Sequence, residues 1–171
     1  ASMLDRIAEF PNLVVLRTVS KLGLAGIRLG YAVGAAGWID QFEKVRSPYN
    51  VNVLTQAAAR VALANYGTLL DQARLIRNER ARLHASLARL PAVHCHASSA
   101  NFILARVPDA PGACAELARR GILVKSMHGG HRLLDQCIRI TVGTPAENDA
   151  LLAAMAEIVP ADGAPAGDRV V

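Results

Sequence analysis

The alternation of apolar and polar residues predicts short strands near the start of the chain and long helices in its middle. Residues 12–20 and 30–34 are rich in apolar and β-branched residues and flank a glycine-rich turn, which predicts two short buried strands. Helices are predicted over residues 53–66 and about 68–90. The second carries an apolar stripe at helical spacing, formed by Leu69, Ala73, Ile76, Leu83, Leu87 and Leu90. A solvated face is predicted for the arginines that lie mostly off this stripe, Arg74, Arg77, Arg82 and Arg89.

Residues 37–52 are predicted to be irregular, because Pro48 and two asparagines interrupt any helix there. After Pro91 the pattern alternates between element types. Strands are predicted over 100–107, 122–126 and 137–143, and a helix over 111–120. This alternation is typical of a small α/β unit.

The start of the last helix is specified in detail by the sequence. Thr144 is predicted to cap it, Pro145 suits its first turn, and Glu147 completes a capping box. The helix is expected to run to about Val159. The chain therefore divides into an incomplete first domain (1–52), connecting helices (53–90), a small α/β domain (91–159) and a flexible tail (160–171).

Composition restricts the class of protein. With 52% hydrophobic and 4% aromatic residues the chain is globular, and it has no apolar run long enough to span a membrane and no signal peptide pattern. We therefore expect a cytoplasmic protein without membrane partners. The three cysteines form no CxxC pair, and the HGGH sequence at 128–131 reads as a loop, so no metal site is expected.

The net charge of +5 could favour anionic ligands, including nucleic acid. A nucleic-acid surface would need aromatic residues between the basic ones or a known binding module, and neither is present. We expect no nucleic-acid partner. Salt-sensitive binding to single or double strands would be the mark of this alternative.

Lys21 lies in an unusual setting for a lysine. Its neighbours Val19, Leu22 and Leu24 are apolar, which predicts little solvation of the ammonium group and a readiness to form a Schiff base. Hydroxyls at Thr18 and Ser20 and the guanidinium of Arg28 could bind the phosphate of an aldehyde cofactor. An ordinary hairpin with Lys21 and Arg28 pointing to water is an equal alternative on this chemistry alone.

Several motifs resemble histidinol-phosphate aminotransferases, a family of fold-type I pyridoxal-phosphate enzymes. RTVSKLGLAGIRLGYAVG resembles the segment that carries the cofactor lysine, and SPYNVN and CIRITVGTPAEN follow in the family's order. ANFIL and GILVK resemble two strands of the same family. Together the matches extend to about residue 159. The implied fold class is α/β, the C-terminal part of a fold-type I transferase: a remnant of the large-domain sheet, a long connecting helix and a small α/β domain. Parallel strands covered by helices are expected in the large-domain remnant.

The resemblance assigns roles to individual residues. Lys21 would bind pyridoxal 5'-phosphate covalently and later move a proton between substrate and cofactor, while Thr18, Ser20 and Arg28 would hold the cofactor phosphate. Arg139 would bind the carboxylate of an amino-acid partner. Lys125 stands where several family members have an arginine that holds the substrate phosphate, although a solvated lysine at a strand end remains an alternative.

The resemblance also implies that the chain is the C-terminal half of its enzyme and is inactive alone. The implied reaction exchanges an amino group between histidinol phosphate, or a related amino compound, and 2-oxoglutarate in histidine biosynthesis, so the partners would be a small-molecule amino donor and a 2-oxo acid. A homodimer is expected. Two alternatives remain open: a non-catalytic assembly fragment, and a related pyridoxal-phosphate enzyme acting on aromatic or phosphorylated amino acids.

Overall fold

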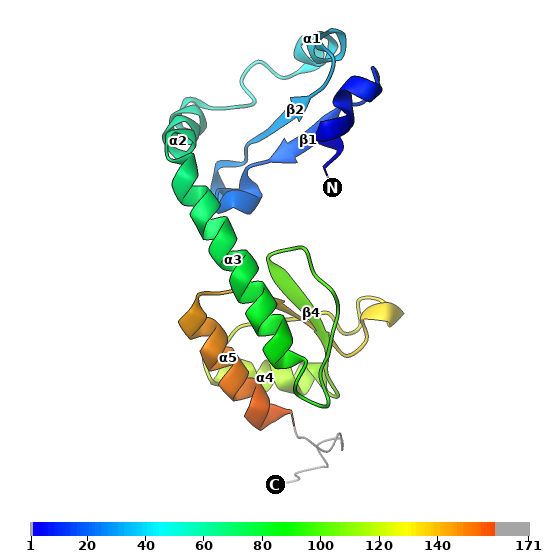
Figure 1. Cartoon of the computed structure of the whole chain (residues 1–171), viewed down its shortest axis with the longest axis vertical. Helices are drawn as coiled ribbons and strands as arrows, with labels where there is room; N and C mark the ends of the chain where they lie inside the picture. Colours follow the sequence, from blue (N-terminus) through cyan, green and yellow to red (C-terminus); the bar gives the residue numbers. More distant parts are fainter. Residues whose placement is uncertain (1, 160–171) are drawn as a thin grey trace. The chain divides into compact units, whose positions relative to one another are not determined.

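A computed structural model of the chain describes residues 2–159. The chain divides between Ala73 and Arg74 into two compact units, which are described separately below. Helix α3 (Tyr66–Leu87) begins in the first unit and ends in the second (Figure 1). The four-part division expected from the sequence stays a prediction, and its tail, residues 160–171, lies outside the described residues.

The first unit contains a two-stranded antiparallel sheet. β1 (Val15–Thr18) pairs with β2 (Gly30–Val33), with Thr18 opposite Gly30. The large-domain remnant was expected to hold parallel strands, and this is wrong for β1 and β2. Parallel strands need a crossover connection, usually a helix, whereas residues 19–29 form only the short 3-10 turns η2 (Ser20–Leu22) and η3 (Ala25–Ile27).

Helices flank this sheet in the sequence. The elements are the 3-10 helix η1 (Met3–Glu9) before it, and α1 (Ala36–Val45) and α2 (Val53–Ala64) after it. The prediction of irregular structure over 37–52 is wrong for α1, because Pro48 and the asparagines lie beyond the helix end at Arg46 and do not interrupt it. The Asn52 side chain caps α2 by accepting a hydrogen bond from the Thr55 N–H at 2.9 Å.

The second unit is built on a four-stranded antiparallel sheet with the order β3-β4-β6-β5. Its strands are β3 (His94–Cys95), β4 (Phe102–Arg106), β5 (Lys125–Ser126) and β6 (Cys137–Thr141). Its helices are α4 (Ala110–Arg119), α5 (Pro145–Ile158), the short 3-10 helix η4 (Arg132–Leu134) and the C-terminal part of α3. The small α/β unit predicted from the sequence is therefore present, with β3 as an additional strand.

The core of the second unit lies between one face of this sheet and the helices. Leu83 and Leu87 of α3 are fully buried, as is Met155 of α5. They pack in one cluster with Ile103 of β4 and Ile138 of β6. Figure 1 shows α5 beside the C-terminal part of α3, which places the apolar sides of both helices on this cluster. The stripe expected from the sequence is thus confirmed at Leu83 and Leu87.

The opposite face of the sheet carries the alternate residues of the central strands. Phe102 and Leu104 of β4 and Arg139 of β6 are partly buried, and Thr141 is exposed. Side chains alternate between the faces of a strand, so these residues point away from the helix-covered core. This second face is where the sequence placed a candidate binding residue, Arg139.

The predicted start of α5 is confirmed in detail. The Thr144 hydroxyl accepts a hydrogen bond from the Glu147 N–H, and the Glu147 carboxylate accepts one from the Thr144 N–H at 2.7 Å. The latter bond, together with one from the Thr144 hydroxyl, lowers the pKa of the Glu147 carboxyl. Pro145 occupies the first turn, and the helix ends next to Val159 as expected.

Candidate active site

A pair of hydroxyl side chains lies at the end of β1. Thr18 Oγ1 is 2.9 Å from Ser20 Oγ and accepts a hydrogen bond from the Ser20 N–H at 3.1 Å. The Thr18 hydroxyl also lies 3.3 Å from the carbonyl oxygen of Leu29, in the segment that leads into β2. Thr18 and Ser20 were both predicted from the sequence as phosphate donors, and the structure shows that their hydroxyls are in contact.

Lys21 lies directly after this pair, in the 3-10 turn η2, as expected for a residue beyond a strand end. Val19 is buried, whereas Lys21 is exposed. The prediction that apolar neighbours would leave its ammonium group poorly solvated is wrong for the chain as described. The tight turn directs Val19 inward and leaves Lys21 on the surface, so sequence neighbours did not indicate the side chain's surroundings.

Arg28 ends the connection between the strands. Its backbone is left-handed, with φ of 52°, and its N–H donates to the Ala25 carbonyl at 3.4 Å. Its guanidinium is exposed and forms no ion pair within residues 2–159, so its donors are available to an anion. The Thr55 hydroxyl of α2 donates to the Ile27 carbonyl at 3.3 Å and ties this loop to the helix.

Two cationic residues oppose one another on the sheet of the second unit. Lys125 of β5 pairs directly with Arg139 of β6 in the antiparallel register. Like charges at such positions destabilise a sheet unless an anion lies between them. Within residues 2–159 neither side chain forms an ion pair, so no carboxylate of this part of the chain neutralises them. The sequence named both residues, and the structure brings them together at a place suited to a negatively charged ligand.

Sequence reasoning missed an aromatic residue beside this pair. The guanidinium carbon of Arg139 lies 5.6 Å from the ring centroid of Phe102 on β4. This distance is within the range of a cation–π contact. The alternation of ANFIL places Phe102 and Leu104 on one strand face, but only the pairing of β4 with β6 brings Arg139 to that face.

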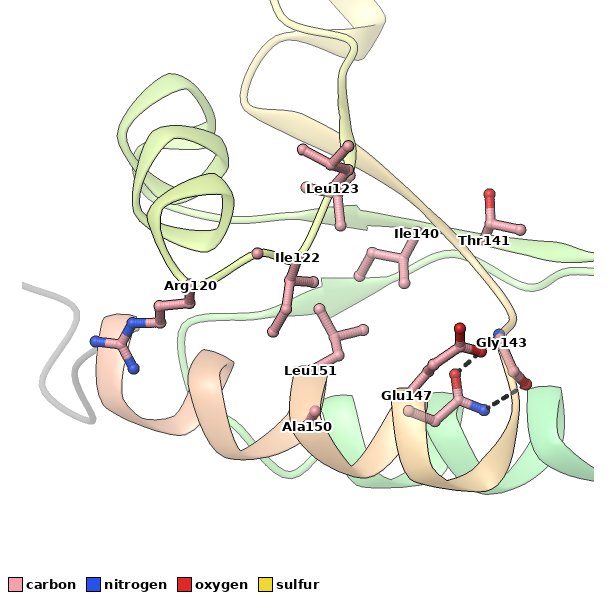
Figure 2. Close-up of a pocket in the computed structure, with 12 residues that line it drawn as sticks. Arg120, Ile122, Leu123, Ile140, Thr141, Gly143, Glu147, Ala150 and Leu151 are labelled. Carbon is pink, nitrogen blue, oxygen red and sulfur yellow. Dashed lines mark hydrogen bonds between the residues drawn. The ribbon is translucent and has the colours of Figure 1, made fainter.

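A cavity of about 540 Å³ lies elsewhere in the second unit, and Figure 2 shows its lining. Ile122, Ile140 and Leu151 form apolar walls, with Arg120 and Glu147 at separate edges. Ile140 belongs to the helix-covered face of β6, opposite to the face of Arg139. The cavity is therefore distinct from the Lys125–Arg139 pair.

A buried polar network fixes the turn after β6. Asn148 accepts a hydrogen bond from the Gly143 N–H at 3.0 Å and donates to the Gly143 carbonyl at 3.1 Å, the bonds drawn at Gly143 in Figure 2. Its amide also donates to Glu79 of α3, which binds Arg82 through both carboxylate oxygens. Hydrogen bonds from Arg82 and then Asn148 lower the pKa of the Glu79 carboxyl. Arg82, expected on a solvated face, instead belongs to this network.

The histidines of the HGGH sequence have local structural partners. His128 Nδ1 accepts a hydrogen bond from the Gln136 N–H at 3.1 Å, and His131 Nδ1 accepts one from the Leu133 N–H at 3.2 Å. Among residues 2–159 no three His, Cys, Asp or Glu side chains are grouped to hold a metal ion. In the same part of the chain, no helix has both the length and the apolar character needed to cross a membrane.

The chain is similar in sequence and in structure to known aminotransferases. The histidinol-phosphate aminotransferase of Chromobacterium violaceum is 54% identical over 154 residues, which are 90% of this chain and 43% of that protein. The crystal structure of histidinol-phosphate aminotransferase from Sinorhizobium meliloti, in complex with pyridoxal-5'-phosphate, matches 86% of this chain and 41% of its own with a TM-score of 0.71 and 31% identity. These findings confirm the resemblance predicted from the sequence.

A related decarboxylase has a similar fold. The L-threonine-O-3-phosphate decarboxylase of Porphyromonas gingivalis matches 88% of this chain and 48% of its own with a TM-score of 0.75 and 25% identity. The likeness to these structures confirms the predicted fold class, the C-terminal part of a fold-type I transferase. This chain spans less than half the length of the relatives it matches.

The family model "Aminotransferase class I and II" matches residues 1–155. That range includes both described units almost entirely, with the hydroxyl pair, Lys21, Arg28, Lys125 and Arg139. The chain belongs to the class I and II aminotransferase family.

Proposed function

We propose that this chain is the C-terminal part of a pyridoxal-phosphate-dependent aminotransferase that exchanges an amino group between histidinol phosphate and 2-oxoglutarate in histidine biosynthesis. The observation that carries the proposal is the position of Lys21 directly after the contacting hydroxyls of Thr18 and Ser20. A lysine amine beside phosphate donors is what a phosphorylated aldehyde cofactor requires. The family membership of the chain supports the same reading.

The donors at the end of β1 fit the cofactor's phosphate. The Thr18 and Ser20 hydroxyls can each donate to a phosphate oxygen, and the guanidinium of Arg28 can donate through two parallel N–H groups. Lys21 would hold the cofactor covalently, and its freed amine would then move a proton between the reacting carbon of the substrate and the cofactor. When bound, pyridoxal phosphate supplies the electron sink of the reaction.

The pair on the second unit's sheet is suited to the substrates. Arg139 binds a carboxylate through its planar fork, which suits 2-oxoglutarate and the glutamate formed from it. Lys125, a compact cation directly opposite, binds the phosphate of histidinol phosphate. Their unneutralised like charges support this assignment, because an anionic ligand removes the repulsion between them.

A second candidate function is decarboxylation of a phosphorylated amino acid. Its support is the similarity in fold and sequence to the threonine-phosphate decarboxylase. The same Lys21 and phosphate donors would serve that reaction. The higher identity to histidinol-phosphate aminotransferases favours transamination.

The chain's assembly and location are part of the same proposal. We propose a homodimer in which much exposed apolar surface of the first unit becomes covered, including Leu16, Tyr49 and Leu54, which are 78%, 92% and 81% exposed. A cytoplasmic location follows from the proposed role in amino-acid biosynthesis.

The proposal is tested by reconstitution. The purified chain is mixed with the preceding part of the Chromobacterium violaceum relative and pyridoxal phosphate, and glutamate formation from histidinol phosphate and 2-oxoglutarate is measured. We expect no turnover by the chain alone, turnover by the mixture, and none when Lys21→Ala is used. Turnover by the isolated chain, or equal turnover with Lys21→Ala, would contradict the proposal, whereas carbon dioxide release from O-phosphothreonine would favour the decarboxylase.

A further inference from the structure

The direction of the Arg139 side chain is determined by its neighbours on β4. Leu104 lies directly opposite Arg139 in the register, and Phe102 lies opposite Thr141. Phe102 and Arg106 are thus the two diagonal neighbours of Arg139 on this face. Diagonal pairs across an antiparallel sheet are within reach of long and aromatic side chains.

The two diagonal neighbours have opposite effects on a guanidinium. Arg106 is a cation, and its own guanidinium is held by the carbonyl oxygens of Leu133, at 2.9 Å, and Asp135. Phe102 offers the negative face of its ring, and the Arg139 guanidinium carbon lies over it at 5.6 Å. The side chain therefore leans toward the Thr141 end of β6 and away from Arg106.

The contact with the ring also leaves the N–H groups of the Arg139 guanidinium free to bind a ligand. A guanidinium over a ring keeps its N–H groups in its own plane, where a carboxylate can accept two of them. If the Phe102 ring already holds the guanidinium plane of Arg139 before a ligand binds, less side-chain conformational entropy is lost on binding. Lys125, the other cation of the pair, has no such aromatic support among residues 2–159.

We propose that Phe102 is a positioning residue that orients Arg139 for carboxylate binding. Phe102 does not contact the substrate in this role. It acts through Arg139 and so deepens the function proposed above, on which it depends. Its loss is expected to weaken carboxylate binding about two- to fivefold, the effect of a cation–π contact that solvent still reaches.

The contact itself is tested by nuclear magnetic resonance of the whole 171-residue chain labelled with ¹⁵N-arginine. The Arg139 Nε–H signal, identified by its loss in Arg139→Lys, is expected to be shifted upfield by the Phe102 ring. The shift should disappear in Phe102→Leu, which keeps an apolar side chain, and persist in Phe102→Tyr, which keeps the ring. Leu104→Ile, on the same face, is the matched control and should leave the shift intact.

The functional consequence is tested on the same samples with glutarate, a dicarboxylate without a reactive keto group. We expect weaker glutarate binding by Phe102→Leu and unchanged binding by Phe102→Tyr and Leu104→Ile. An absent ring shift in the unsubstituted chain overturns the contact, and equal binding by Phe102→Leu overturns the positioning role. A chain with the ring shift that does not bind glutarate overturns the carboxylate role proposed for Arg139, and the positioning role with it.

Discussion

The amide nitrogen of Asn148 donates to Glu79 Oε2 at 2.9 Å, joining two residues that are 69 positions apart in the sequence. Asn148 is 2% exposed and Glu79 is 8% exposed, so the bond is shielded from water. Because Asn148 also binds both backbone groups of Gly143, it connects α3 to the turn that follows the Arg139 strand. This turn is therefore held by the core of the unit.

We predict that Asn148→Ala lowers the free energy of unfolding by about 2 kcal/mol, because it leaves the Gly143 N–H and part of the Glu79 carboxylate without partners in a buried place. Urea unfolding followed by circular dichroism measures the change. Asp149→Ala is the matched control, since the Asp149 side chain is 63% exposed and its ion pair with Arg82 lies at the surface. An equal effect of both substitutions would refute the assignment of a special role to Asn148.

The lowered pKa of Glu79 predicts a loss of stability in acid. A glutamate whose folded pKa lies below the unfolded value of about 4.3 stabilises the fold above that value, and the contribution is lost as the pH falls through it toward the folded pKa. We expect the free energy of unfolding to fall between about pH 5 and pH 3, with a smaller fall in Glu79→Gln. Glu157→Gln, at a side chain 67% exposed, is the control. The same pH dependence in Glu79→Gln and the unsubstituted chain would show that Glu79 is not the responsible group.

The capping box of α5 predicts different losses of stability for two substitutions of Thr144. Thr144→Ala removes the hydroxyl that accepts from the Glu147 N–H and should cost about 1 kcal/mol of stability. Thr144→Ser keeps the hydroxyl and should cost little. Thermal unfolding of the three proteins measures the order, and a Thr144→Ser variant as unstable as Thr144→Ala would show that the methyl group, and not the cap, is what matters.

The packing of α3 predicts a contrast between two leucines on one helix. Leu83 is fully buried, so Leu83→Ala should destabilise the second unit by about 2 to 5 kcal/mol through lost burial and a residual cavity. Leu75 is 48% exposed, and Leu75→Ala should change the stability by about 0.5 kcal/mol or less. Chemical unfolding measures both, and similar losses would contradict the burial described for α3.

Local signals predicted the second unit better than the first. The cap at Thr144 and the apolar residues Leu83 and Leu87 are specified by neighbours in the sequence, and both predictions hold. The antiparallel pairing of β1 with β2 agrees with the hairpin alternative and not with the parallel strands expected from the resemblance, because strand direction depends on how the connection folds. Helix α1 was missed because Pro48 was taken to interrupt any helix over residues 37–52, whereas α1 ends before Pro48.

In the candidate site, too, local features were predicted from the sequence and features that depend on tertiary structure were not. Residue type and a motif placed Arg139 and Lys125 on strands, but their direct opposition depends on the register of β5 with β6, which the sequence does not contain. The role of Asn148 depends on a distant residue and was likewise hidden. Apolar neighbours of Lys21 predicted poor solvation, yet a tight turn separates the directions of adjacent side chains and leaves Lys21 exposed.

The most direct test of the central claim is to identify the lysine that binds the cofactor. The chain contains only Lys21, Lys44 and Lys125, so the latter two serve as internal controls. The purified chain is incubated with pyridoxal phosphate, reduced with borohydride and mapped by peptide mass spectrometry. The account predicts selective labelling of Lys21, reduced when Arg28→Ala removes a phosphate donor. Labelling spread evenly over the three lysines, or absent from Lys21, would contradict it.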